Sequence, residues 1–202
     1  KSSYGTDYWT IAQSTASYQP TWNASGQNSK PYLNFDGTDI LYLSKTISTG
    51  FSQPFSFWMV GDKTGNCWGP YQDAANNYLY FSHSNDDDYY YHSHAYGAEP
   101  TGYPKHPQIW NLHRDDNQDT KMYHHGDNKG TAKGTKTNIN CIRGFGRNLG
   151  ASFGAKGRIY EMFFFVGSPS YTSHGLLSDA DLNKLNAYAH AKYNFSDTPT
   201  DY

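Results

Sequence analysis

Glutamates that could serve as a catalytic pair are scarce in this chain. Glutamate occurs only at Glu99 and Glu161, and neither has a close acidic neighbour in the sequence. Hydrolysis of a glycosidic bond normally needs two carboxyl groups about 5 to 9.5 Å apart, one of which donates a proton. The sequence therefore argues against a glucanase, although a site built on aspartates is harder to exclude, and we expect Glu161 to belong to the framework.

Histidines offer a second catalytic candidate. His92 and His94 share one face of an expected strand, and His113 and Arg114 could join them as a base and a cation. Such groups would suit a lyase that acts on a uronate polymer. Alternation along the strand places Tyr91 on the face opposite His92, so these two cannot enter one cleft together. A polysaccharide lyase remains as the lesser alternative.

Three consecutive aspartates, Asp86, Asp87 and Asp88, are the candidate metal ligands. Calcium binds carboxylate and carbonyl oxygens, so it is the ion that this stretch would hold, although the spacing is not that of an EF-hand. Successive side chains of a strand point to opposite faces, and all three converge only if a turn curls them together. The alternative is a solvated, acidic hairpin tip. We expect the protein to require no cofactor.

Aromatic residues make up 17% of the chain, and the middle third interleaves them with amides. A sugar site needs a rigid aromatic face for the pyranose ring and amides for its hydroxyl groups. Part of the same aromatic set must instead fill a core. The residues that we expect to bind a ligand lie on strands and loops between 66 and 111: Trp68, Tyr71, Tyr78, Tyr80, Tyr89, Tyr91, Tyr96, Trp110, Asn76 and Asn77.

Short strand-like runs, separated by turn residues, must position these groups. Asp36-Gly37 is a strong turn signal within residues 31–44, and residues 78–83 and 89–94 predict a hairpin. Residues 97–107, rich in Pro and Gly, predict a long loop. Further strands are expected at 54–61, 109–114, 120–124, 141–147 and 157–167, with Phe57, Phe81, Phe163 and Phe165 in the core. Many short strands at regular spacing predict an all-β fold, a β-sandwich.

One helix is expected, at residues 178–193. Ser178 and Asp181 form an acidic variant of the capping box at its start. Leu182, Leu185 and Ala189 then fall on one face at helical spacing, with Tyr193 at the end of the same face. The pattern predicts an amphipathic helix that covers a sheet.

The two cysteines, Cys67 and Cys141, lie in no spacing typical of a zinc site. Two buried thiols and one long-range disulfide are both compatible with the sequence.

Three segments together resemble the concanavalin A-like lectin/glucanase superfamily, in particular its laminin-G-like jelly-roll modules. The first runs from Gln19-Pro-Thr to the Phe-Asp-Gly-Thr-Asp of residues 35–39, the second is residues 55–61, and the third joins residues 157–165 to Leu177-Ser-Asp-Ala-Asp-Leu. The resemblance implies a single jelly-roll domain over residues 1–202, with two antiparallel sheets and one short C-terminal helix. The retaining glucanases of the superfamily carry an E-x-D-x-x-E run, which this chain lacks.

The resemblance implies a non-catalytic lectin-like or adhesive module, exposed outside a cell or on a virion surface. Its expected partner is a surface glycan; the alternative is a structural phage virion protein that contacts other virion or cell-surface proteins. Homo-oligomers are compatible with either. A net charge of −2, without a basic run, argues against nucleic acid, and the apolar run Met162–Val166 is too short for membrane insertion. The fold alone does not fix the function.

Overall fold

The computed structural model describes residues 2–4, 7–9, 11–43, 55–63, 71–72, 78–79, 88–91, 94–98, 107–114, 119–124, 127–133, 144–145, 156–166 and 177–195. The strands of the first half are β1 (Ser2–Tyr4), β2 (Asp7–Trp9), β3 (Ile11–Ala12), β4 (Thr21–Asn23), β5 (Tyr32–Asp36), β6 (Leu41–Leu43), β7 (Phe55–Lys63), β8 (Tyr71–Gln72), β9 (Tyr78–Leu79), β10 (Asp88–Tyr91) and β11 (His94–Ala98). Those of the second half are β12 (Gln108–Arg114), β13 (Asp119–His124), β14 (Asp127–Lys133), β15 (Gly144–Phe145) and β16 (Lys156–Val166). The helices are η1 (Ala16–Tyr18), η2 (Gln27–Ser29) and α1 (Asp179–Tyr193).

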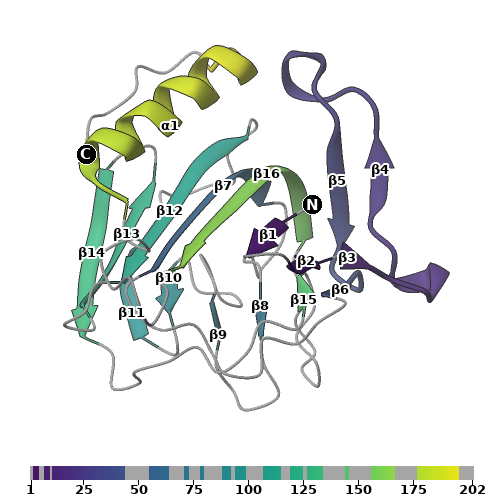
Figure 1. The fold of residues 1–202 in the computed structure, drawn as a ribbon, viewed down its shortest axis with the longest axis horizontal. Coiled ribbons are helices and arrows are strands. Elements are labelled where there is room, and N and C mark those ends of the chain that lie inside the picture. Colours follow the sequence, from purple (N-terminus) through teal and green to yellow (C-terminus); the bar gives the residue numbers. More distant parts are fainter. Residues whose placement is uncertain are drawn as a thin grey trace.

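The described part of the chain is mostly β, with a large open antiparallel sheet and a C-terminal helix (Figure 1). The sheet has the strand order β14-β13-β12-β7-β16-β5-β4, and α1 lies across one of its faces. Shorter strands pair in the orders β11-β10-β9-β8, β15-β6-β3 and β1-β2. The predicted β-rich class with a C-terminal helix is confirmed. The jelly roll of two sheets and the single domain stay predictions.

Strand positions follow the sequence pattern where the runs are apolar. β7, β12, β13 and β16 each begin and end within two residues of the expected ranges. Leu79 of β9 pairs with Tyr91 of β10, as the expected hairpin requires. However, residues 94–98 form β11, which pairs with β10 where the sequence predicted the start of a loop. β14 was not expected, because Gly and Lys interrupt its apolar pattern.

Three rows of residues cross the helix-covered face of the sheet, taking every second position of each strand. The first row contains Phe165, Ser56, His113 and Lys121; the second contains Phe163, Trp58, Asn111 and Tyr123; the third contains Glu161, Val60 and Ile109. Each residue of a row stands on a different strand, in the order β16, β7, β12 and β13. On β7 and β12 the rows change from the polar Ser56 and His113 to the apolar Val60 and Ile109.

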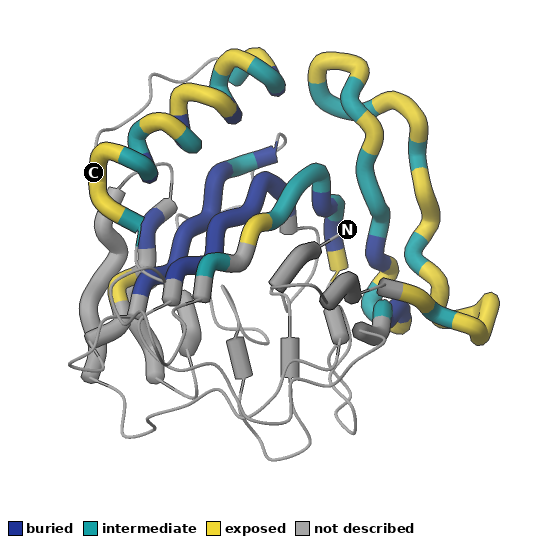
Figure 2. The backbone as a smooth tube through the Cα atoms, viewed as in Figure 1, coloured by how far each residue is buried: buried dark blue, intermediate teal, exposed yellow. Residues whose placement is uncertain are grey.

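Both faces of the central strands are buried (Figure 2). Under α1, the side chains of Trp58, Val60 and Ile109 form one cluster with Ala189 and Tyr193 of the helix. On the opposite face, β7 and β12 bury Phe57, Met59, Trp110 and Leu112. Phe57 thus occupies the core position that the sequence predicted.

Phe163 was also expected in the core, and this is wrong. Its side chain is 37% exposed, and its ring stacks against Trp58 with centroids 5.3 Å apart. Phe163 lies on the helix-covered face of the sheet, on β16, where it pairs with Trp58 of β7. Trp58 is fully buried under α1, whereas Phe163 is not. Phe165, two residues further along, is partly buried, and Phe81 lies outside the described residues.

The helix begins and ends with local caps. Ser178 Oγ accepts the backbone N–H of Asp181 at 3.2 Å, which confirms the N-cap half of the expected capping box. The return bond differs, because Asp181 Oδ2 accepts the hydroxyl of Ser178 at 2.7 Å. Asn194 ends the helix in a left-handed conformation with a φ of 52°, its N–H bonded to the carbonyl of His190. The buried face contains Leu182, Ala189 and Tyr193 as expected, and Asn186 as well.

Candidate functional site

The four short strands β8 to β11 bring together several of the tyrosines expected to bind a ligand. Leu79 of β9 pairs with Tyr71 of β8 on one side and with Tyr91 of β10 on the other, so the three residues form one row. Tyr78 pairs with Gln72 in the neighbouring row, which alternation assigns to the other face of the strands. Tyr89 belongs to β10 and Tyr96 to β11. We call β8 to β11 the tyrosine strands.

Other predicted ligands cannot be placed. Trp68, Asn76, Asn77, Tyr80, Asp86, Asp87, Cys67 and Cys141 lie outside the described residues. Asp88 is the first residue of β10, and the pairing with β11 shifts by one residue between Asp88 and Tyr90. Within the described ranges, no group of three or more His, Cys, Asp or Glu side chains could hold a metal ion. The calcium site stays a prediction.

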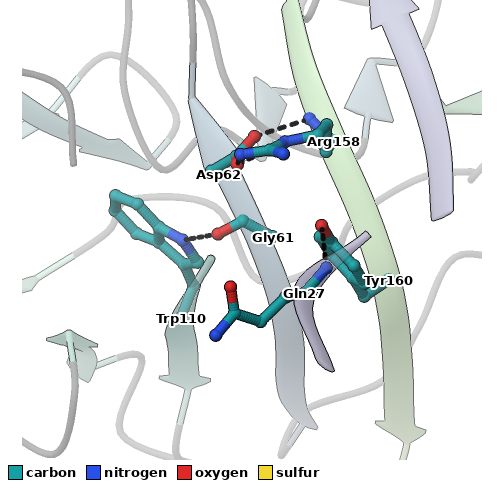
Figure 3. Close-up of polar contacts among 6 residues, drawn as sticks. All are labelled: Gln27, Gly61, Asp62, Trp110, Arg158 and Tyr160. Carbon is teal, nitrogen blue, oxygen red and sulfur yellow. Dashed lines mark hydrogen bonds and ion pairs between the residues drawn. The ribbon is translucent and has the colours of Figure 1, made fainter. Parts of the chain in front are cut away.

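Trp110 does not offer an open ring. Its side chain is 2% exposed, and its indole N–H donates to the carbonyl of Gly61 at 3.1 Å (Figure 3). β12 is an interior strand of the sheet with both faces covered, so an aromatic residue there fills the core. The expectation that Trp110 contacts a ligand is therefore corrected.

His113 is also enclosed, in the first row under α1, with 6% of its surface exposed. Burial, and then the positive charge of Lys121, lower the pKa of His113 to about 4. The imidazole is neutral at neutral pH and packs edge-on against the ring of Tyr123, 5.5 Å between centroids. A side chain in this position does not face a substrate, which argues against His113 as the base of a lyase.

Asp62 of β7 is fully buried, and its carboxylate binds Arg158 of β16. The backbone N–H of Arg158 donates to Oδ1 at 3.0 Å, and Nε donates to Oδ2 at 2.6 Å (Figure 3). Nη2 contacts the same Oδ2, and the guanidinium lies over the ring of Tyr32. The hydrogen bond with Asp62 is the main reason why the pKa of Arg158 is raised. Because its charge is already balanced, Arg158 is poorly suited to bind an anionic substrate.

Glu161 uses both carboxylate oxygens to hold α1. Lys192 Nζ lies 2.5 Å from Oε1, the hydroxyl of Tyr188 donates to Oε1 at 2.9 Å, and the hydroxyl of Tyr193 donates to Oε2 at 3.1 Å. Burial, followed by the charge of Glu161, raises the pKa of Tyr193. These bonds support the expectation that Glu161 belongs to the framework.

A loop near the start of the chain completes the same end of the helix. Gln27 Nε2 donates to the carbonyl of Tyr193, and Asn28 Nδ2 donates to the carbonyl of Lys192, each at 2.9 Å. Carbonyls in the last turn of a helix lack partners within the helix, so these amides supply them. The backbone N–H of Gln27 also donates to the hydroxyl of Tyr160 at 3.1 Å (Figure 3).

Among the described residues, the most exposed large hydrophobic side chain is Trp22, at 65%. It lies on β4, the outer strand of the large sheet, with Leu33 as its partner on β5. No motif in the sequence marks this tryptophan as exposed. One exposed aromatic side chain is normal for a protein surface.

No family model and no curated protein matches the chain. The resemblance to laminin-G-like modules therefore rests on the three segments given above. No helix in the described part of the chain has the length and apolar character that crossing a membrane demands.

Proposed function

We propose that this protein is a non-catalytic, surface-exposed module that binds glycans outside a cell or on a virion. The row of Tyr71, Leu79 and Tyr91 across the tyrosine strands carries the proposal. Tyr71 and Tyr91 are two strands apart, which is about 10 Å at the usual strand spacing. Two tyrosines at that separation suit one extended oligosaccharide, since each ring offers an apolar face and a hydroxyl group.

The proposed scaffold is a jelly roll of two packed sheets. Side chains on both faces of β7 and β12 are buried, yet α1 is placed against only one of these faces. A sheet that buries both faces needs a layer on each side. The tyrosine strands are the natural candidates for part of the second layer, and β11 approaches β14 at the edge of the large sheet.

Three titratable groups of the large sheet whose side chains the structure describes favour a binding role over catalysis. Glu161 and Arg158 are engaged in bonds within the framework, and His113 is buried and neutral. Catalysis of glycan cleavage would need an acid, a base or a cation facing the substrate.

A glycan array probed with the purified protein tests this proposal, with Tyr91→Ala and Tyr71→Ala as variants. We expect each to weaken binding to the best glycan by about tenfold, which is about 1.4 kcal/mol. Tyr90→Ala is the matched control, since Tyr90 pairs with Ala95 in the neighbouring row of the same strand. Its affinity should stay within about threefold of the wild-type value.

Other outcomes favour the alternatives. A protein that binds no glycan on the array but forms defined assemblies would contradict the proposal and support a structural virion role. New ultraviolet absorbance from incubated uronate polymers would indicate unsaturated products and support a lyase. Equal losses of glycan affinity in Tyr90→Ala and Tyr91→Ala would show that the row of Tyr71, Leu79 and Tyr91 is not the binding site.

A further inference from the structure

Three polar side chains beneath α1 carry groups without a hydrogen-bond partner in the protein. They are the indole Nε1 of Trp58, both amide atoms of Asn111 and Nε2 of His113. Trp58 and Asn111 have no exposed surface, and His113 is 6% exposed. A buried polar group that loses its bonds to water costs about 1 to 3 kcal/mol, so such groups are rare in folded proteins.

The register of the sheet places these groups close together. Asn111 and Trp58 are paired residues of the second row, whose Cβ atoms are about 5 Å apart at the usual geometry. His113 is two residues from Asn111 on the same strand, hence on the same face and about 7 Å away. Groups at these separations are too far apart for direct bonds in most orientations, but one bridging molecule reaches two of them.

The donors and acceptors present match water. Trp58 offers one donor, Asn111 offers two donors and an acceptor, and the neutral imidazole of His113 offers a donor or an acceptor at Nε2. A buried water typically makes about three hydrogen bonds to polar groups that would otherwise lack partners. The buried side chain of Asn186 on α1 adds polarity on the helix side of the same interface.

We propose that the interface between the sheet and α1 binds internal water, centred on Asn111 and bridging it to Trp58 and His113. The site occupies the first two rows, on the face of the sheet that α1 covers. In the third row, Val60 and Ile109 instead belong to an apolar cluster with Ala189. Water at this position satisfies side chains that the packing of α1 removes from bulk solvent.

Nuclear magnetic resonance of the full chain tests the site directly, with water itself as the probe. We expect a cross peak between long-lived water and the indole N–H proton of Trp58. Trp110 is an internal control, because its equally buried indole donates to the carbonyl of Gly61. Its N–H should show no such cross peak. The substitutions Trp58→Phe and Trp110→Phe assign the two indole signals.

Asn111→Leu keeps the volume of the side chain but removes its polar atoms. The water cross peak at Trp58 should be lost or reduced at least severalfold in this variant. A high-resolution crystal structure of the wild-type protein provides a second measurement that needs no variant. Absence of water between Asn111 and its neighbours in that structure, or equal cross peaks at Trp58 and Trp110, would overturn the proposal.

Discussion

The two ends of α1 rest on different chemistry. Its beginning lies over the polar first row, where the backbone N–H of Leu177 donates to Ser56 Oγ at 2.9 Å and His113 is buried beside it. Its end lies over Val60 and Ile109 and is bonded to Glu161, Gln27 and Asn28. One helix thus begins over polar residues with few bonds to the sheet, and ends over apolar residues with several polar bonds around them. Local opening of α1 should therefore start at its N-terminal end.

Acidification should cause the largest loss of stability, and it should act on the N-terminal end of α1. His113 has a pKa of about 4 in the folded protein against 6.5 for a free imidazole, so the unfolded chain binds the proton first. The contribution of the neutral His113 to the free energy of unfolding is complete above about pH 6.5. It declines as the pH falls toward 4, by about 3 kcal/mol in total. The neighbouring groups are Ser56, Lys121 and Tyr123, whose pKa is raised by burial and then by Asp179 of α1.

Urea unfolding of the wild type and of His113→Gln, at several pH values, measures this loss. The wild type should lose more stability than the variant between pH 6.5 and 4. If the free energy of unfolding of the two proteins fell in parallel with pH, His113 would not be the source of the pH dependence.

Removal of the anchor at the other end should have the next largest effect. Glu161→Ala breaks the bonds to Lys192, Tyr188 and Tyr193, and we expect a loss of about 2 to 3 kcal/mol in the free energy of unfolding. Glu161→Gln is the control, because it retains the shape and one acceptor and should lose less. If both variants matched the wild type in urea unfolding, the end of α1 would not be anchored by Glu161.

Gly26→Ala should displace the loop at residues 24–30, which bonds to the last turn of α1 through Gln27 and Asn28. A Cβ at Gly26 would lie 2.5 Å from the hydroxyl oxygen of Tyr160 and 2.6 Å from Cδ1 of Tyr32. Relief of this overlap requires the loop to move, at a cost of about 2 kcal/mol. Hydrogen exchange should then accelerate in the last turn of α1 and not in its first turn. Ala24→Ser, an exposed change in the same loop, should leave exchange as in the wild type.

Ser178→Ala should give the smallest effect, about 1 kcal/mol, because it removes one helix cap. Hydrogen exchange should accelerate in the first turn of α1, while the last turn stays protected. Ser25→Ala serves as a control at an exposed serine. Acceleration along the whole helix would show that its two ends open together and would remove the contrast between them.

Local patterns in the sequence were sufficient for the helix and the central strands. The capping box and the face of Leu182, Ala189 and Tyr193 depend on neighbours within a few residues. β7 and β16 are long apolar runs with recognisable ends. These features are encoded by spacing alone, so the sequence predicts them without knowledge of the tertiary packing.

The roles of single residues depended on contacts that spacing does not encode. Trp110 was expected to face a ligand because it is aromatic, but its position on an interior strand makes it part of the core. Phe163 was expected inside, but it lies on a strand that α1 covers incompletely. The partners of Glu161 come from a helix about thirty residues further along, and only the docking of that helix brings them together.

The bonds from Gln27 and Asn28 to the end of α1 span 166 and 164 positions of the chain. They are contacts of very high sequence separation, so they cannot form until α1 has been synthesised. On a ribosome, which adds residues from the N-terminus, the early loop must remain without its partner until α1 emerges. We therefore expect the loop at residues 24–30 to form these bonds only after α1 has left the ribosome, and truncations within α1 to release the loop.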